Sequence, residues 1–588
     1  MNSLFFDYSP MLQRQNDYDN YIFITHFLRH NFLPNCRLSP KDYKNLSEAF
    51  PLLIPSISNF ATLKEWVACD ADKILQFLIL NKRFDERELN RYLTISSTNG
   101  FLKNIKLFNK YYQHIVHDQR KQIFQVCCKN DHLQIVQWLH EMFNLTRDDI
   151  IAHDNYVFRY SCANGYLQVA QWLHETFNFK KDDMEADINS TFRVCCARGH
   201  FYVAQWLYET FNLTKNDAIA EDNYAFRYSC ANGYLQTAQW LYKTFGITRE
   251  YVRMRNNCAF CHSCENGRLE VAQWLHKTFN LTRDDMMAHN NYAFCCSCVY
   301  GHLEVAQWLH KTFNLMRDEI VVVNNYYVFR YCCSNGNLQT LQWLHETFNI
   351  TKDDIIFCYN NAICCSCKRG RLDIVQWLYK TFNLTRDDII AYNNYAFCYS
   401  CANGHLHVAQ WLHKTFNMTR DDAMAHNNYI FHRCYEYCHL QVIQWVQKTF
   451  NLTKDDVAAC INYAFWYNCN NGSLQYVQWL YEAFNLTRDD MMVNDNRAFR
   501  HSCKFGHLHI AQWLHKTLNL TEDEAKTHNN YAFRHSCLNG FLQIAQWLHK
   551  TFNMTRDDAM AHNNYIFCQS GARGHLHVAH WLHETFNL

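Results

Sequence analysis

Hydrophobic residues recur along most of this chain with the spacing of an amphipathic helix. In the stretch HLHVAQWLHKTFN, residues 405–417, positions i, i+3, i+4, i+7 and i+8 are Val408, Trp411, Leu412, Thr415 and Phe416. The preceding stretch NNYAFCYSCAN, residues 393–403, predicts a shorter helix. Gly404 separates the two stretches, and a single glycine supplies the left-handed backbone that ends one helix before the next begins. The pattern therefore predicts a helix–turn–helix unit.

This unit repeats, and tryptophan marks the period. The interval between tryptophans is 34 residues, with one exception of 35, at Trp138, Trp172, Trp206, Trp240, Trp274, Trp308, Trp343, Trp377, Trp411, Trp445, Trp479, Trp513, Trp547 and Trp581. Twelve of the 15 glycines lie seven residues before these tryptophans, at Gly165, Gly199, Gly233, Gly267, Gly301, Gly336, Gly370, Gly404, Gly472, Gly506, Gly540 and Gly574. Fourteen clear units cover roughly residues 120–588. Repetition at this period predicts a solenoid, in which each unit packs against its neighbours.

The connector between units carries a helix-capping pattern. In NMTRDDAMAHNN, residues 417–428, Thr419 is followed three residues later by Asp422, which has the form of a capping box. Asp421 and Asp422 lie where the first turn of a helix carries a partial positive charge, so both carboxylates are favourable there. We expect a short capped helical turn rather than a β-hairpin.

The units resemble the ankyrin repeat. In YAFRHSCLNGFLQIAQWL, residues 531–548, a short helix, a glycine turn and a V-A-x-W-L-like helix follow in the ankyrin order. Tyr-Ala-Phe-Arg stands in place of the family's Thr-Pro-Leu-His, and the hairpin signatures are missing. A tetratricopeptide repeat would instead place its tryptophan in the first helix. The resemblance implies an all-α ankyrin-like helix–turn–helix solenoid with short capped turns in place of hairpins, and the arrays of giant DNA viruses of amoebae look most similar.

The N-terminal part departs from this pattern. The stretch ISSTNGFLKNIKLF, residues 95–108, has Gly100 in the turn, so we expect one or two degenerate repeats within 61–118, before an array over 119–588. Residues 1–60 match no unit and predict a separate helical segment. Within it, LPNCRLSPKDYKNLSEAFPLL faintly resembles an F-box, which would imply a ubiquitin-ligase adaptor.

Composition limits the classes of partner. The 56 basic residues balance 55 acidic ones, whereas a nucleic-acid-binding protein normally carries a basic excess. No apolar run is long enough to span a membrane, and the polar start MNSLFFDYSP lacks the pattern of a secretory signal. We therefore expect a cytoplasmic protein that is not secreted, and one in the host cytoplasm if it is viral.

Cysteine and histidine occupy interchangeable columns of the repeat. Twelve of the 29 cysteines lie three residues before the turn, where ankyrin repeats keep a small alanine. A second column holds Cys261, Cys295, Cys364 and Cys398 but arginine in other units, at Arg159, Arg193, Arg227, Arg330, Arg500 and Arg534. The place of His413 is tyrosine at Tyr208, Tyr242, Tyr379 and Tyr481. Because these columns exchange residue types, packing is favoured over zinc binding or catalysis, and we expect no catalytic residue, metal or cofactor.

Recognition of a protein is the function that remains. A solenoid offers an extended concave binding surface, and aromatic residues and arginine anchor protein interfaces. The column five residues before the turn holds such residues, and we predict partner contacts at Tyr160, Tyr228, His262, Tyr331, Tyr399, Arg433, Tyr467, His501 and His535. The unit at 427–450 lacks the turn glycine, and Trp466 replaces arginine in the next unit, which predicts a special contact or bend.

Three functions stay open at this level. A non-enzymatic interaction scaffold, in the viral case acting on a host target, is favoured. A ubiquitin-ligase adaptor would act through residues 1–60. A structural virion or filament subunit is suggested by the C-terminal unit, because HWLHETFNL is followed by no polar capping helix and self-association there is conceivable.

Overall fold

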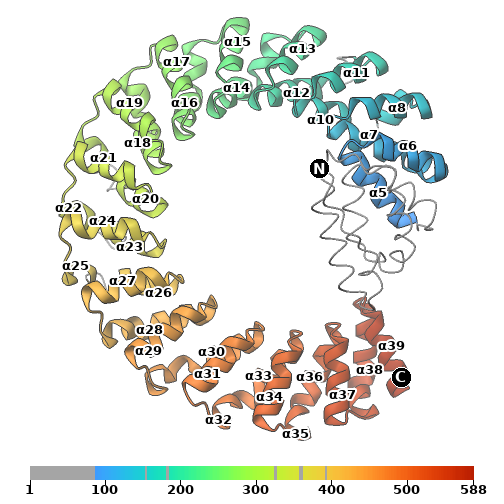
Figure 1. Ribbon diagram of the computed structural model, residues 1–588, viewed down its shortest axis with the longest axis vertical. Coiled ribbons are helices and arrows are strands. Elements are labelled where there is room, and N and C mark those ends of the chain that lie inside the picture. Colours follow the sequence, from blue (N-terminus) through green and yellow to red (C-terminus); the bar gives the residue numbers. More distant parts are fainter. Residues whose placement is uncertain are drawn as a thin grey trace, which may run out of the picture. The chain divides into compact units, whose positions relative to one another are not determined.

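The computed structural model describes residues 86–587, apart from 152–154, 181–184, 323–326, 357–361 and 391–393. Every regular element within these described residues is a helix, which confirms the predicted all-α, ankyrin-like solenoid of helix pairs (Figure 1). The predicted segment 1–60 and the beginning of the predicted segment 61–118 lie outside the described residues. The boundaries proposed for those segments therefore stay predictions.

The second helix of each pair is the uniform one. It begins directly after the turn. Of the stripe predicted from the sequence, Val408, Leu412 and Phe416 are buried, whereas Trp411 and Thr415 are half-buried. These helices are α6 (Leu102–Tyr111), α8 (Leu133–Phe143), α11 (Leu167–Phe177), α13 (Phe201–Phe211), α15 (Leu235–Phe245), α17 (Leu269–Phe279), α19 (Leu303–Phe313), α21 (Leu338–Phe348), α24 (Leu372–Phe382), α27 (Leu406–Phe416), α29 (Leu440–Phe450), α31 (Leu474–Ala483), α34 (Leu508–Leu518), α37 (Leu542–Phe552) and α39 (Leu576–Phe586).

The first helix of each pair packs against the second and against the first helix of the next pair. Its buried side is small or aromatic, as with Phe397, Ser400 and Cys401. These helices are α5 (Glu86–Thr98), α7 (Gln113–Lys129), α10 (Tyr156–Ala163), α12 (Glu185–Ala197), α14 (Lys215–Asn232), α16 (Arg249–Glu265), α18 (Arg283–Val299), α20 (Tyr327–Asn335), α23 (Ala362–Lys368), α26 (Tyr395–Ala402), α28 (Arg420–Glu436), α30 (Ala458–Asn470), α33 (Val493–Lys504), α36 (Thr527–Leu538) and α38 (Arg556–Ala572).

The connectors are short capped helical turns, as predicted. Thr419 accepts a hydrogen bond from the Asp422 amide, and the Asp422 carboxylate accepts one from the Thr419 amide at 2.7 Å. Within several first helices the turn is part of the same element; the separate ones are α9 (Arg147–Ile151), the π-helix η1 (Asp318–Val322), α22 (Lys352–Ile356), α25 (Arg386–Ile390), the 3₁₀-helix η2 (Asp455–Val457), α32 (Arg488–Met491) and α35 (Glu522–Ala525). No strand occurs among the residues that the structure describes.

After the capped turn, the typical connector passes through three left-handed residues. Asn494, Asp495 and Asn496 have φ values of 58°, 53° and 64°. The arginine six residues before the turn glycine holds this bend: Arg500 donates to the Asp495 carbonyl at 3.0 Å and to the Asn494 carbonyl at 2.9 Å. Arg227 makes the equivalent bonds in its own repeat. In the arginine column, which we interpreted as packing between repeats, Arg227 and Arg500 therefore brace the connector of their own repeat, whereas Arg193 pairs with Glu221 of the next repeat at 2.7 Å.

The turn glycine is required by backbone geometry and by the neighbouring repeat together. Gly404 has a φ of +81°, and a Cβ built there would lie 2.7 Å from the His439 ring of the next turn. Cys438 occupies the glycine column one repeat later with a φ of 57°. In the turn after Cys438 the usual ring is replaced by Ser473, whose hydroxyl lies 3.4 Å from the Cys438 sulfur. The loss of the glycine is thus matched by a smaller neighbour.

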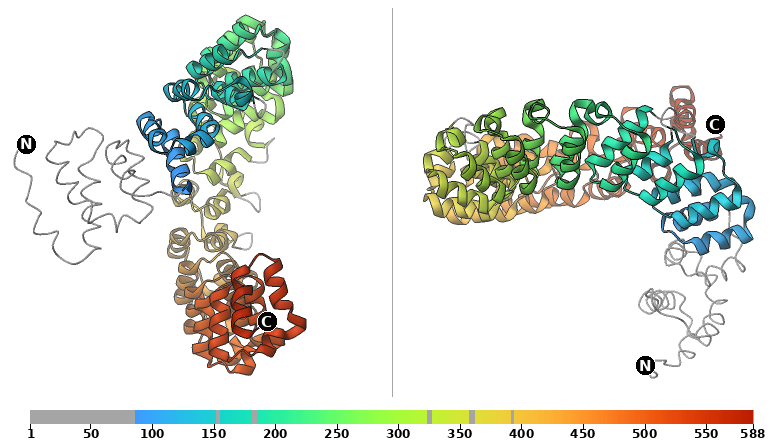
Figure 2. Two further views of the ribbon diagram at one scale, coloured as in Figure 1. Left: turned by 90° about the vertical axis from the view of Figure 1, so that its right-hand side faces the viewer. Right: turned by 90° about the horizontal axis from the view of Figure 1, so that it is seen from above.

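The chain divides into two compact units. One comprises Met1–Ser263 with Glu270–Asn280, and the other comprises Cys264–Leu269 with Leu281–Leu588. Within each unit, successive pairs lie side by side, with first helices in one layer and second helices in the other (Figure 2). The first helices lie on the inner side of each curved stack (Figure 1).

Candidate protein-binding face

The nine predicted contact residues all lie on first helices, and all of them reach the surface. Tyr228 and Tyr331 are 41% and 44% exposed, and the other seven are half-buried. They belong to α10, α14, α16, α20, α26, α28, α30, α33 and α36. The column therefore forms one row on the inner layer of each unit.

A second aromatic column, which the sequence analysis overlooked, accompanies the first. One helical turn before the predicted residue lies Tyr156, Tyr224, Tyr327, Tyr395, Tyr463 or Tyr531. The two rings of each repeat touch: Tyr224 and Tyr228 have centroids 4.3 Å apart, and Tyr531 and His535 lie 4.1 Å apart. The recurring Tyr-x-x-x-Tyr/His spacing is the signal that predicts this contact, because residues i and i+4 share one helix face.

In the second unit the rings connect from repeat to repeat. Tyr399 contacts Tyr429, Tyr463 contacts both Tyr435 and Trp466, Trp466 contacts His501, and His501 stacks on Tyr531 at 5.9 Å. We call this set the aromatic strip: Tyr395, Tyr399, Tyr429, Tyr435, Tyr463, Trp466, Tyr467, His501, Tyr531 and His535. Of the nine predicted residues it brings together Tyr399, Tyr467, His501 and His535. Arg433 joins it, with its guanidinium 6.0 Å from the centre of the Tyr429 ring.

Trp466 belongs to a repeat whose connector folds differently. The sequence CINYAF replaces HNNYAF, and α30 continues straight from Ala458 through this stretch. Ile461 is β-branched and disfavours the left-handed conformation that asparagine tolerates. No brace is needed in a connector without the bend, and Trp466 fills the column that arginine or cysteine fills elsewhere. This connector therefore lacks the left-handed bend, while the special contact predicted for this region stays a prediction.

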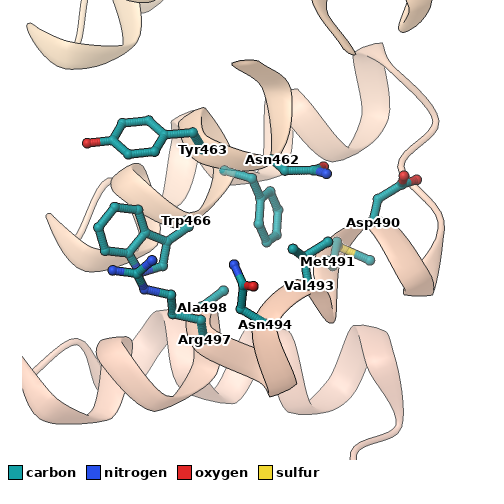
Figure 3. A pocket seen from close by; sticks show the side chains of 10 residues that line it. Asn462, Tyr463, Trp466, Asp490, Met491, Val493, Asn494, Arg497 and Ala498 are labelled. Carbon is teal, nitrogen blue, oxygen red and sulfur yellow. The ribbon is translucent and has the colours of Figure 1, made fainter. Parts of the chain in front are cut away.

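A cavity of about 120 Å³ opens beside Trp466, between α30 and the following connector with α33 (Figure 3). Its walls combine apolar groups with amides and one cation, at Asn462, Tyr463, Phe465, Trp466, Asp490, Met491, Val493, Asn494, Arg497 and Ala498. The Arg497 guanidinium covers the Trp466 ring at 3.9 Å from its centre. The Trp466 Nε1 donor is buried and has no hydrogen-bond partner. Such a small mixed hollow can accept one side chain of a partner.

Cations of the second unit fall into two rows. In the connector row, the basic residue of each capped turn pairs with the capping carboxylate of the next repeat, as Arg386 does with Asp422 at 2.6 Å. The row continues through Arg283–Glu319, Arg317–Asp354, Lys352–Asp388, Arg420–Asp456, Lys454–Asp490 and Arg488–Glu524. Where Glu522 replaces the basic residue, Lys526 pairs with Asp558 instead. These pairs link adjacent connectors.

The second group of cations consists of Arg497 and Lys504 on the aromatic strip, and it differs from the connector row in its lack of carboxylate partners. Arg497 and Lys504 are half-buried among rings, and neither forms an ion pair with any carboxylate of the described part of the chain. Burial, and then Arg497, Lys504 and Arg500, lower the pKa of His501 to about 4. Burial, with Lys504, lowers the pKa of His535 likewise to about 4. Both imidazoles are neutral at pH 7, so the positive charge beside His501 comes from Arg497, Arg500 and Lys504.

The cysteine columns are buried inside the stack. Cys401 has no exposed surface, and burial raises the pKa of Cys398 to about 12, so both thiols stay protonated. The histidines bond to main-chain carbonyls: His405 to Lys368 at 3.0 Å, and His413 to Met418 at 3.1 Å. The His413 ring also packs edge-on against Trp445. These side chains serve packing between repeats.

Neither a membrane span nor a metal cluster emerges from the described residues. None of their helices is both long and apolar enough to cross a bilayer. Nor do they contain a group of three or more histidine, cysteine or acidic side chains placed to hold a metal ion.

Comparisons with known proteins give one family match. The family model "Ankyrin repeats (3 copies)" matches residues 329–422. A search of curated proteins gives no significant match. Among solved structures, the chain is similar to the pentatricopeptide repeat protein PPR10 from maize at 10% identity, covering 96% of this chain and 99% of that one with a TM-score of 0.22. At that TM-score nothing about function follows from the likeness, and the conclusion of these comparisons is that residues 329–422 carry ankyrin repeats.

Proposed function

We propose that this protein is a non-enzymatic scaffold that binds a partner protein through the first helices of its ankyrin-like repeats. The observation that carries the proposal is the aromatic strip of the second unit, which places adjoining rings on the surface of consecutive first helices. Rigid aromatic side chains with a polar tip contribute large contact area at low entropic cost, so they are the usual anchors of protein interfaces. The proposed contact residues are the nine predicted ones together with the second aromatic column.

The biological setting belongs to the same proposal. The repeats resemble the ankyrin arrays of giant DNA viruses of amoebae, which supports a viral protein that acts on a host target in the host cytoplasm. The ankyrin match at residues 329–422 fits protein binding, since such repeats are typical of interaction scaffolds.

Affinity capture from amoeba lysate tests this proposal. The full chain is compared with a variant that carries Tyr228→Ala, Tyr331→Ala and Tyr399→Ala, and with a control that carries Tyr202→Ala and Met142→Ala. The control residues are 68% and 47% exposed but lie on the second helices α13 and α8. We expect a partner protein that the control retains and the first-helix variant loses. Equal capture by both variants would contradict binding through the first helices.

A further inference from the structure

On α33, the aromatic strip carries two half-buried cations, Arg497 and Lys504, that no carboxylate of the described residues neutralises. In the connector row of the second unit, each capped turn from Arg283 to Arg488 has its basic residue on a carboxylate of the next repeat. Arg497 and Lys504, by contrast, lie on rings and have no carboxylate partner among the described residues. Because half-buried cations are costly to leave without a counter-charge, this face is complementary to an anionic ligand.

The two cations and the rings between them form a defined array on one helix. Arg497, His501 and Lys504 are spaced i, i+4 and i+7 on α33, so they share one face. Arg497 and Lys504 are about 10 Å apart along the helix axis, at 1.5 Å per residue. Trp466 lies beneath the first cation, and the Tyr531 ring lies 5.8 Å from the second. These ring contacts restrict both side chains before any partner arrives.

We propose that the α33 face binds an extended acidic segment of the partner protein, with two carboxylates three residues apart resting on Arg497 and Lys504. In a polyproline II segment, which has three residues per turn and a rise of about 3.1 Å per residue, side chains three residues apart lie on the same side and about 9 Å from each other, close to the separation of the two cations. The residues between the carboxylates lie over the His501 and Tyr531 rings and beside the cavity at Trp466. This inference rests on the proposed function and supplies the chemical class of the partner.

A protein segment fits this surface better than a nucleic acid does. Binding to a phosphate backbone needs an extended row of free cations, because each neutralised phosphate contributes separately. Here the cationic stretch is short and carries carboxylates beside it: Glu436 is paired to Arg433, and Asp495, two residues before Arg497, has a side chain that is 74% exposed. A polyanion would meet repulsion from these carboxylates along its length, whereas a short acidic segment would not.

Fluorescence polarisation with the full chain tests the inference. The probes are a labelled peptide containing Glu-Leu-Leu-Glu, its Gln-Leu-Leu-Gln counterpart, and a labelled oligothymidylate of about twelve nucleotides. We expect the acidic peptide to bind, and the amide peptide to bind at least about tenfold more weakly, because charge-assisted hydrogen bonds are lost. Lys504→Gln and Arg497→Gln should each weaken binding of the acidic peptide by about tenfold.

Matched variants separate charge from folding. Lys414→Ala and Lys516→Ala remove exposed lysines of the second helices α27 and α34 and should leave peptide binding unchanged. Arg497→Lys keeps the charge but loses the planar stacking on Trp466, so it should bind more tightly than Arg497→Gln and more weakly than the parent. Circular dichroism checks that every variant is folded. An imidazole NMR signal of His501 should also titrate at higher pH in the presence of the acidic peptide, because a bound carboxylate stabilises the imidazolium.

Several results would overturn the inference. Equal binding of both peptides, or unchanged binding by the Arg497 and Lys504 variants, removes the acidic-segment site. Binding of the oligothymidylate but not of the acidic peptide, with loss in the Arg497→Gln variant, replaces it with a nucleic-acid site. If the acidic peptide fails while the lysate capture still depends on Tyr228, Tyr331 and Tyr399, the scaffold function stands and only the proposed partner chemistry falls.

Discussion

Two consecutive connectors of the second unit occupy the same place in the repeat and fold in opposite ways. Before α33 the chain bends through three left-handed residues, and Arg500 reaches back to hold two of their carbonyls. Before α30 the chain is helical, and Trp466 replaces the bracing arginine. Residues 255–257 form the same bend with Cys261 in the bracing position, so an arginine is not required for the bend. Where isoleucine disfavours the bend, the same position holds Trp466. The comparison teaches that the connector residues themselves decide whether the chain bends, and that an arginine in the bracing position adds hydrogen bonds to a bend that is already formed.

Removing the brace should have the largest effect. Arg500 is 8% exposed, so Arg500→Met would leave two connector carbonyls without a strong donor and destabilise the second unit by about 3 kcal/mol. The matched change Arg497→Met on the same helix removes only a ring contact and should cost less than about 1 kcal/mol. Urea unfolding followed by circular dichroism measures both. Local hydrogen exchange over 494–498 should rise in the Arg500 variant alone, and unchanged exchange there would contradict the brace.

Two substitutions in the turns are expected to change the stability of the fold in opposite directions. Gly404→Ala adds a Cβ in the left-handed region and against the His439 ring, so we expect a loss of about 2 kcal/mol. Cys438→Gly relieves a left-handed non-glycine residue beside the small Ser473 and should stabilise by about 1 kcal/mol. Differential scanning calorimetry of the two variants gives the sign of each change. If both variants melt below the parent, the contact of Cys438 with Ser473 more than compensates the lost glycine, and the expected relief of strain in Cys438→Gly is wrong.

The sequence was sufficient for the repeat, the helix pair and the capped turn, because each rests on local spacing: the tryptophan period, Gly404 and the Thr419–Asp422 pair. It was insufficient for features that depend on which side chains of different repeats meet in space. The Arg386–Asp422 pairs join residues 36 apart, two more than the period, so nothing in a single unit points to them. The second aromatic column was visible in the sequence as the spacing of Tyr395 and Tyr399. The structure shows in addition that Tyr399 contacts Tyr429 of the next repeat, which the sequence does not predict. The left-handed connector was missed because asparagine there also suits an ordinary helix start.

The connector row makes a smaller, pH-dependent prediction at the junction of the regular and irregular repeats. The Asp456 carboxylate accepts hydrogen bonds from Arg420 of the preceding repeat and from Thr453, and these lower its pKa to about 2, from an ordinary value of 3.8. A lowered folded-state pKa means that this contribution to stability is complete above about pH 4 and is lost as the pH falls towards 2. Asp456→Asn should therefore destabilise by about 1 kcal/mol at pH 7. The difference from the parent should shrink as the pH falls below 4.

The neighbouring acid provides the control for this prediction. Asp455 belongs to the same connector but forms no ion pair among the described residues, and Asp455→Asn should leave the pH profile of the parent unchanged within about 0.5 kcal/mol. Urea unfolding midpoints measured from pH 7 to pH 2.5 compare the three proteins. Parallel profiles for Asp456→Asn and the parent would mean that the charge of Asp456 does not stabilise the junction. Convergence at low pH would mean that the charged carboxylate, through its bonds to Arg420 and Thr453 together, stabilises the junction at which the connector changes its fold.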